Sequence, residues 1–226
     1  LGGSAGFIGK VSDDKLGNQF KNSISDSGLK DLTVFESDDK QTGLCAIFIT
    51  PDGERTMNTY LGAGEHLSKQ DLDEKEIEKA EILYMEGYLW DKPSSKDAFL
   101  YASSVNSDSG GKNAITLSDV FCVEAHRESF IGLIKENIHY VFCNEDELNS
   151  LTLESSTDKS FKYFEEKLNT NNDWIISRTG VEERRISLID VDKMGALAAK
   201  EALSEIEGKP DLILNASGVG KQVIPD

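Results

Sequence analysis

Short apolar runs alternate with stretches of helical periodicity from residue 6 to about residue 150. Residues 6–11 predict a strand, and Asp13 or Asp14 can cap the helix that follows it. The apolar positions of this helix share one stripe, formed by Leu16, Phe20 and Ile24. Gly28 predicts the end of the helix, because a glycine commonly follows the last helical turn.

Two β-rich runs interrupt this rhythm, at residues 42–50 (TGLCAIFIT) and at residues 55–61 (RTMNTYL). Pro51, Asp52, Gly53 and Glu54 separate them, and this composition is typical of a tight turn. We therefore expect an antiparallel hairpin at this place in the chain.

The alternation of strands and helices resumes after the hairpin. It predicts helices over residues 71–80, 94–105 and 123–135, and strands over residues 81–86, 113–118 and 138–143. This order favours a doubly wound, largely parallel α/β sheet, whose ligands bind beyond the carboxyl ends of the strands. The residues expected at that edge are Gly87, Tyr88, Ser118, Asp119 and residues 144–147. Turns and helix caps use the same polar residue types, so a purely structural role stays open for each.

Charge and cysteine content narrow the possible partners. The formal net charge of −17 argues against a broad surface for nucleic acid or an anionic membrane. No apolar run approaches the roughly 20 residues that span a bilayer, and no signal peptide is evident, so we expect a cytoplasmic protein. Cys45, Cys122 and Cys143 lack CxxC spacing, which favours small apolar residues over disulfides or zinc ligands.

Five segments carry a resemblance to a known family: FIGKVSDDKLGNQF, TGLCAIFITPDGERTMNTYLGA, EGYLWD, ITLSDVFCVEAHR and FCNEDE. They resemble the pfkB carbohydrate kinases, in particular their adenosine-kinase-like bacterial branch, over a partial domain at residues 1–154. The resemblance implies a truncated ribokinase-like doubly wound sheet with the hairpin as a small β-lid. It also implies transfer of the γ-phosphoryl group of ATP, with Mg²⁺, to a hydroxyl group of a small-molecule sugar or nucleoside.

The resemblance assigns a phosphate and magnesium side to the site. Asn144 and Glu147 match the family's NxxE motif, and their oxygens suit a hard cation bound mostly through water. Asp119 resembles a polar residue near the phosphate path. The alternative for Asn144 and Glu147 is a helix cap, and His126 is expected to be a solvated surface residue.

The resemblance also assigns a substrate side. Asn58, Thr59, Gly62 and Ala63 match the lid strand and the Gly-Ala turn that border the sugar pocket in the family. A glycine at this turn permits close approach of the backbone. The alternative is the simple end of a strand.

Two family elements have no counterpart in the sequence. The amino-terminal sugar-binding segment is expected before residue 1, and the GAGD motif, which carries the general-base aspartate and an anion hole, is expected after Glu147. No GAGD string occurs there. Because phosphoryl transfer depends on positioning and charge stabilisation, we expect that this chain alone is not a working kinase.

Residues 155–226 resemble a different family. The string LNTNNDWIISRTGVEERRIS, followed by a helix and the strand DLILNASG, is similar to the amino terminus of a β-ketoacyl-acyl-carrier-protein synthase III. This resemblance implies a partial thiolase-like fragment and a vestigial site for a coenzyme A thioester at Thr170, Trp174 and Arg178. An indole packed under a helix and a row of surface arginines are the alternative. The family's cysteine nucleophile and its His and Asn partners are expected in later sequence.

The polar stretch LTLESSTDKSFKYFEEK is expected to be an exposed linker between the two parts. Three hypotheses follow: a kinase-derived chain that has lost activity, an acyltransferase-derived fragment, and a non-catalytic chimeric or misassembled product. Missing strands would leave open sheet edges, so we expect marginal stability and a tendency to associate.

Overall fold

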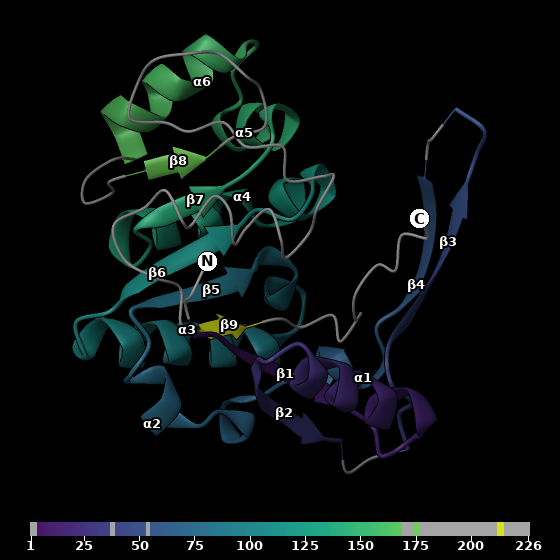
Figure 1. Cartoon of the computed structure of the whole chain (residues 1–226). Coiled ribbons are helices and arrows are strands. Elements are labelled where there is room, and N and C mark those ends of the chain that lie inside the picture. The colour runs from purple at the N-terminus through teal and green to yellow at the C-terminus, as the bar shows by residue number, and fades with distance from the viewer. Residues whose placement is uncertain (1–3, 37–38, 53–54, 169–173, 177–211, 215–226) are drawn as a thin grey trace.

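The computed structural model describes residues 4–36, 39–52, 55–168, 174–176 and 212–214. Seven strands form one sheet in the order β2-β1-β9-β5-β6-β7-β8, and the neighbouring strands pair in parallel (Figure 1). Their bounds are β1 Gly6–Val11, β2 Lys30–Phe35, β5 Ile82–Glu86, β6 Lys112–Thr116, β7 Tyr140–Phe142, β8 Trp174–Ile176 and β9 Leu212–Leu214. The predicted parallel α/β architecture is therefore observed.

The helices cover both faces of this sheet. They are α1 Lys15–Asp26, α2 Glu74–Ile77, α3 Pro93–Asp108, α4 Val120–Glu136, α5 Glu145–Thr152 and α6 Thr157–Tyr163. Strand β1 shows the two faces, because successive side chains of a strand point to opposite sides. Phe7 and Val11 pack with Phe20 and Ile24 of α1, whereas Ile8 belongs to the main core cluster on the other side. A sheet buried on both faces is what a doubly wound fold requires.

The main core lies around β5, β6 and β7. Leu83, Ile115 and Val141 are fully buried in it. The ring of Trp90 packs edge-on against Phe99, with 5.1 Å between ring centroids. Side chains of α3 and α4 therefore share one core with strands β5, β6 and β7.

The predicted hairpin is confirmed. Strands β3 (Leu44–Ile49) and β4 (Arg55–Tyr60) pair antiparallel, with Leu44 opposite Tyr60 and Ile49 opposite Arg55. Every residue of β4 is exposed, and the hairpin projects away from the sheet (Figure 1). It therefore has the position of a lid that is attached at its base.

Two elements differ from the sequence prediction. Strand β2 was not predicted, because its partly exposed KDLTVF run has no continuous apolar stretch. The predicted helix over residues 71–80 is reduced to the four residues of α2. Leu72 is extended, and the side chain of Asp73 caps a new start by accepting from the backbone N–H of Lys75 at 3.1 Å.

The predicted exposed linker is wrong for residues 157–168. This segment forms α6 and one further helical turn at Phe164–Leu168, and both Phe164 and Leu168 are buried in the main core. The hydroxyl of Ser160 accepts from Thr152 at 2.8 Å and donates to Asn149 at 2.6 Å. Ser160, one of the serines that suggested a linker, is therefore hydrogen-bonded between α5 and α6.

Strands β8 and β9 come from the segment expected to be a separate partial domain. Strand β8 pairs in parallel with β7, and β9 pairs in parallel with both β1 and β5. These described residues of the segment therefore complete the same sheet. Within the described part of the chain, no helix has the length and apolar character needed to cross a membrane.

Replacement of Phe164 by alanine tests whether α6 is part of the folding unit. Because this side chain is 1% exposed in the core, Phe164→Ala should lower the free energy of unfolding by about 3 kcal/mol. Phe121→Ala is the matched control, because Phe121 is 81% exposed. Urea unfolding followed by circular dichroism measures both. Equal effects of the two substitutions would contradict the observed packing.

Candidate functional site

Parallel pairing brings three polar loops to the same edge of the sheet. Glu86 ends β5, Ser118 and Asp119 follow β6, and Asn144 follows β7. Strand β6 pairs with both β5 and β7. The edge predicted from the sequence is therefore formed, with carboxylate, hydroxyl and amide groups on adjacent strands.

Glu86 is an acid with a strongly perturbed pKa at this edge. Although part of the residue is accessible, its carboxyl group is desolvated, and burial raises its pKa to about 7. The hydroxyl of Ser118 donates to it at 3.5 Å, which opposes the rise. Glu86 is not among the residues predicted from the sequence, which are Gly87 and Tyr88 in this loop. The available signal was a single acid at the end of the buried run ILYME.

The loops that carry Glu86 and Ser118 are tightly packed. A Cβ atom on Gly87 would lie 2.7 Å from the carbonyl oxygen of Thr116 and 3.0 Å from the hydroxyl oxygen of Ser118. Ser118 itself has a φ of 73°, a left-handed conformation that is costly for a residue with a side chain. The backbone is thus held so that the Ser118 hydroxyl faces the Glu86 carboxylate.

Asp119 links two of the predicted site residues. One of its oxygens accepts from the backbone N–H of Cys122 at 2.6 Å and caps α4, and the other accepts from the hydroxyl of Tyr88 at 2.6 Å. Burial and this bond raise the pKa of Tyr88 far above its ordinary value. The structure therefore brings Tyr88 and Asp119 together, with Asp119 also serving as a helix cap.

Asn144 and Glu147 form a reciprocal capping box at the start of α5. The Asn144 side chain accepts from the backbone N–H of Glu147 at 2.8 Å. The two Glu147 oxygens accept from the backbone and side chain of Asn144 at 3.2 and 2.8 Å. Glu147 is only 6% exposed. The helix-cap alternative is thus observed, and Asn144 is the more accessible residue of the motif.

The acidic edge fits a hydrated cation better than a directly ligated one. Among the described residues, no group of three His, Cys, Asp or Glu side chains is placed to hold a metal ion. The carboxylates of Asp119 and Glu147 are already engaged by neighbouring donors. Since Mg²⁺ retains several water ligands in many phosphate sites, this donor set suits an ion bound through water.

The four lid residues fall into two groups. Asn58 and Thr59 lie on the exposed strand β4, where the Thr59 hydroxyl oxygen is 3.1 Å from the sulfur of Cys45. Gly62 and Ala63 lie at the base of the hairpin and are buried. Gly62 has a φ of +56°, and a Cβ atom there would lie 2.3 Å from the carbonyl oxygen of Gln41. The close approach expected at this glycine is therefore made by the chain itself.

One of the three residues expected to bind coenzyme A lies in a described strand. Trp174 lies in β8, where its backbone pairs with Tyr140 of β7. Thr170 and Arg178 lie outside the described residues.

The structure also shows the surroundings of His126 and of the three cysteines. His126 is partly buried rather than fully solvated, and its Nε2 atom lies 2.7 Å from a carboxylate oxygen of Asp91. Cys122 and Cys143 are buried and free, as expected for small apolar residues, whereas Cys45 is partly exposed.

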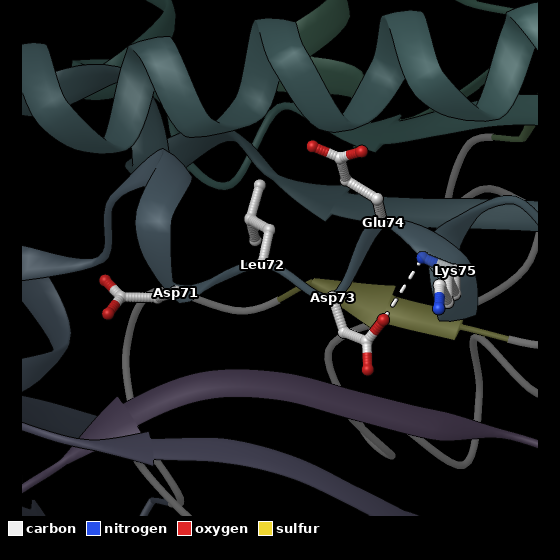
Figure 2. A pocket seen from close by; sticks show the side chains of 5 residues that line it. All are labelled: Asp71, Leu72, Asp73, Glu74 and Lys75. Atoms are coloured by element: carbon white, nitrogen blue, oxygen red, sulfur yellow. Dashed lines mark hydrogen bonds between the residues drawn. The ribbon is translucent and has the colours of Figure 1, made fainter.

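A shallow depression lies elsewhere on the molecule. Figure 2 shows that one stretch of chain lines it, with Asp73 accepting from the backbone of Lys75. This stretch runs into α2, the helix before the amino end of β5, whereas Glu86 lies at the carboxyl end of that strand. All five lining residues are consecutive, from 71 to 75. The depression therefore lacks the convergent polar groups of a ligand site.

The buried carboxyl group of Glu86 predicts a pH-dependent stability. Its pKa is about 7 in the folded chain against an ordinary value of 4.5, so the unfolded state ionises first and stability falls between these two pH values. Allowing for partial exposure, the loss is on the order of 2 kcal/mol. Glu86→Gln should remove this loss in unfolding titrations at pH 5 and pH 8. Asp146→Asn, at an exposed acid of α5, should retain it. An unchanged pH dependence in Glu86→Gln would contradict the assignment.

Most of the chain is similar to known proteins. Residues 1–201 match the sequence model of the pfkB family carbohydrate kinases. A probable sugar kinase protein from Rhizobium etli CFN 42 is 34% identical with a TM-score of 0.70, over 74% of this chain and 51% of that chain. Adenosine kinase from Sinorhizobium meliloti is 30% identical with a TM-score of 0.71, over 81% of this chain and 61% of that chain. The chain thus spans about half to three fifths of these solved relatives.

Curated relatives match shorter parts of the chain. Aminoimidazole riboside kinase of Salmonella typhimurium (strain LT2) is 40% identical over 76 residues, which are 32% of this chain and 23% of that protein. β-Ketoacyl-[acyl-carrier-protein] synthase III of Blochmanniella pennsylvanica (strain BPEN) is 54% identical over 41 residues, or 17% of this chain and 13% of that protein. Because the family model covers most of the sequence, this chain belongs to the pfkB family of carbohydrate kinases.

Proposed function

We propose that the edge formed by β5, β6 and β7, together with the hairpin β3–β4, binds a sugar or nucleoside and ATP for phosphoryl transfer to a hydroxyl group. The observation that carries this proposal is the alignment of Glu86, Ser118 and Asn144 at the carboxyl ends of adjacent parallel strands. Ligands of open α/β sheets bind at such edges. Membership of a carbohydrate kinase family supports the reaction class.

The acceptor side of the proposed site consists of Glu86 and the lid. A carboxylate in a desolvated position accepts hydrogen bonds from hydroxyl groups strongly, which suits the several hydroxyls of a sugar ring. Asn58 and Thr59 offer amide and hydroxyl groups on the exposed hairpin, and Gly62 and Ala63 form its base. An adenosine-like nucleoside is our first candidate, because a solved adenosine kinase is 30% identical. A simple sugar is the alternative, since the 34% identical relative is a probable sugar kinase protein.

The phosphate side consists of Asn144, Glu147 and Asp119. A bare triphosphate is repelled by carboxylates, whereas a magnesium–nucleotide complex presents a cation to them. Asn144 and Glu147 would hold the Mg²⁺ through water, and the ion would neutralise charge on the transferred phosphoryl group. The acidity of this edge therefore favours ATP delivered with its metal.

We also propose that this chain alone does not catalyse phosphoryl transfer. The sequence contains Gly-Ala-Gly-Glu at residues 62–65 but no Gly-Ala-Gly-Asp. Glu65 of that string lies at the base of the lid, where its carboxylate pairs with Lys92 at 3.2 Å. Asp119 is held by Tyr88 and by the start of α4. Neither acid is positioned as a free general base beside an anion hole of backbone amides.

For residues 155–226 we propose ancestry shared with a ketoacyl synthase III, without acyl transfer by this chain. The 41-residue similarity to that enzyme supports the ancestry. The strand β8, which contains Trp174, pairs with β7 in the kinase-like sheet. A coenzyme A site at Thr170, Trp174 and Arg178 thus remains a secondary proposal, which isothermal titration with coenzyme A tests directly.

Calorimetric titration and a turnover assay together test the main proposal. We expect MgATP and one member of a panel of nucleosides and sugars to bind, with no phosphorylated product above background. At pH 8, where the Glu86 carboxyl group is ionised, Glu86→Gln should weaken acceptor binding roughly tenfold, because a hydrogen bond to a charged group is lost. Asp73→Asn, a substitution at the cap of α2, should leave acceptor binding unchanged.

Each outcome of these assays is informative. Phosphorylated product would overturn the proposed lack of turnover and would make Glu86, with a pKa of about 7, the first candidate for the base. Failure of a folded chain to bind every panel member and MgATP would overturn the binding proposal itself.

A further inference from the structure

The lid is attached to the body through a partly buried polar cluster at its base. Its centre is the carboxylate of Asp14, which accepts from the backbone N–H of Thr42 and from the Thr42 hydroxyl, each at 2.8 Å. Thr42 lies two residues before β3 and is 2% exposed. Its hydroxyl oxygen also accepts from the backbone N–H of Ser12 at 2.9 Å. The first strand of the lid is thereby tied to the segment between β1 and α1.

The same carboxylate caps helix α1. It accepts from the backbone N–H of Gly17 at 2.7 Å, so Asp14 joins the helix start and the lid base at once. Burial opposes ionisation of Asp14, but the hydrogen bonds from Thr42 and Gly17 lower its pKa. A Cβ atom on Gly17 would lie 2.0 Å from the Ser12 carbonyl oxygen and 2.8 Å from the Thr42 hydroxyl oxygen. The helix start therefore packs directly on the cluster.

The returning strand of the lid meets the same place. The backbone N–H of Ala63 donates to the carbonyl oxygen of Gln41 at 2.9 Å, and Ala63 is fully buried. Gly62 makes the close approach to Gln41 described above. Both ends of the hairpin are thus fixed beside Asp14, whereas the strand β4 between them is exposed along its length. A two-stranded hairpin is marginally stable alone, so its base determines its direction.

We infer that Asp14 is a positioning residue that sets the orientation of the lid, through its bonds to Thr42, independently of its role as the cap of α1. Among the described residues, the Asp14 carboxylate accepts hydrogen bonds at the start of α1 and at the lid base, from Gly17 and Thr42. It acts through Thr42 on the strands that carry Asn58 and Thr59. The inference concerns the lid and holds whether or not the chain transfers a phosphoryl group.

Asp14→Asn separates the two roles of the residue. Asparagine caps helices about as well as aspartate, so the bond to Gly17 is retained. Its amide nitrogen, however, cannot accept from the Thr42 backbone N–H, because both groups are donors. Thr42→Val is the second variant, since it keeps the shape of the side chain and removes the hydroxyl. Asp73→Asn is the matched control, because Asp73 caps α2 through Lys75 and Glu76 away from the lid.

Cys45 provides a direct reporter in the lid. It is partly exposed on β3, whereas Cys122 and Cys143 are buried, with burial raising the pKa of both thiols. The rate of labelling of Cys45 by a maleimide, and amide exchange over residues 40–62, are measured in the native chain. We expect both rates to rise roughly tenfold in Asp14→Asn and Thr42→Val, as expected for loss of a charge-assisted bond. Asp73→Asn should leave both rates unchanged.

Unchanged lid rates in folded Asp14→Asn and Thr42→Val would overturn the inference. Global unfolding is recognised independently, because it exposes Cys122 and Cys143 to labelling as well. If Asp14→Asn unfolds, Thr42→Val alone decides: wild-type lid rates in that variant contradict the inference, and faster lid rates with protected buried thiols support it.

Discussion

Parallel pairing of β5, β6 and β7 is the constraint on which the candidate site depends. Parallel strands all end at the same edge, so the side chains that follow them are collected there regardless of their separation in sequence. Glu86, Ser118 and Asn144 are brought to adjacent strands in this way. Gly87, directly after β5, packs tightly against the backbone carbonyl of Thr116. The raised pKa of Glu86 is a consequence of burial at this edge.

The lid supplies the second half of the arrangement. Strand β4 is exposed on both faces, and the base of the hairpin is held by Asp14 and by the contact between Gly62 and Gln41. Lids of this kind can close over a bound ligand. The doubly wound body agrees with the fold of the solved relatives.

The sequence predicted the parts of this fold whose signals are local. The hairpin followed from two β-rich runs around a Pro-Asp-Gly turn, and the parallel sheet followed from alternating apolar runs and helical stripes. Asp119 and Asn144 were predicted at the sheet edge, and both are there. Glu86 was missed because its importance comes from desolvation by neighbouring loops, which a single sequence does not display. The same limit hid the anchoring role of Asp14, since its partner Thr42 is 28 residues away.

The order of the strands and the helical structure of residues 157–168 could not be predicted from local sequence patterns either. Ser-rich composition predicted a linker, yet Phe164 and Leu168 reach the core. Strand β9, late in the sequence, lies between β1 and β5. Such placements depend on which sheet edges are available for pairing, a property of the assembled fold.

The most direct test of a shared site is an amide-exchange footprint of the chain with MgATP and its best-binding nucleoside or sugar. The account predicts added protection in two places at once: the loops at residues 86–88, 118–119 and 144–147, and the hairpin with its base at residues 58–63. Protection confined to residues 71–75, or limited to the hairpin while the sheet edge exchanges as before, would contradict it.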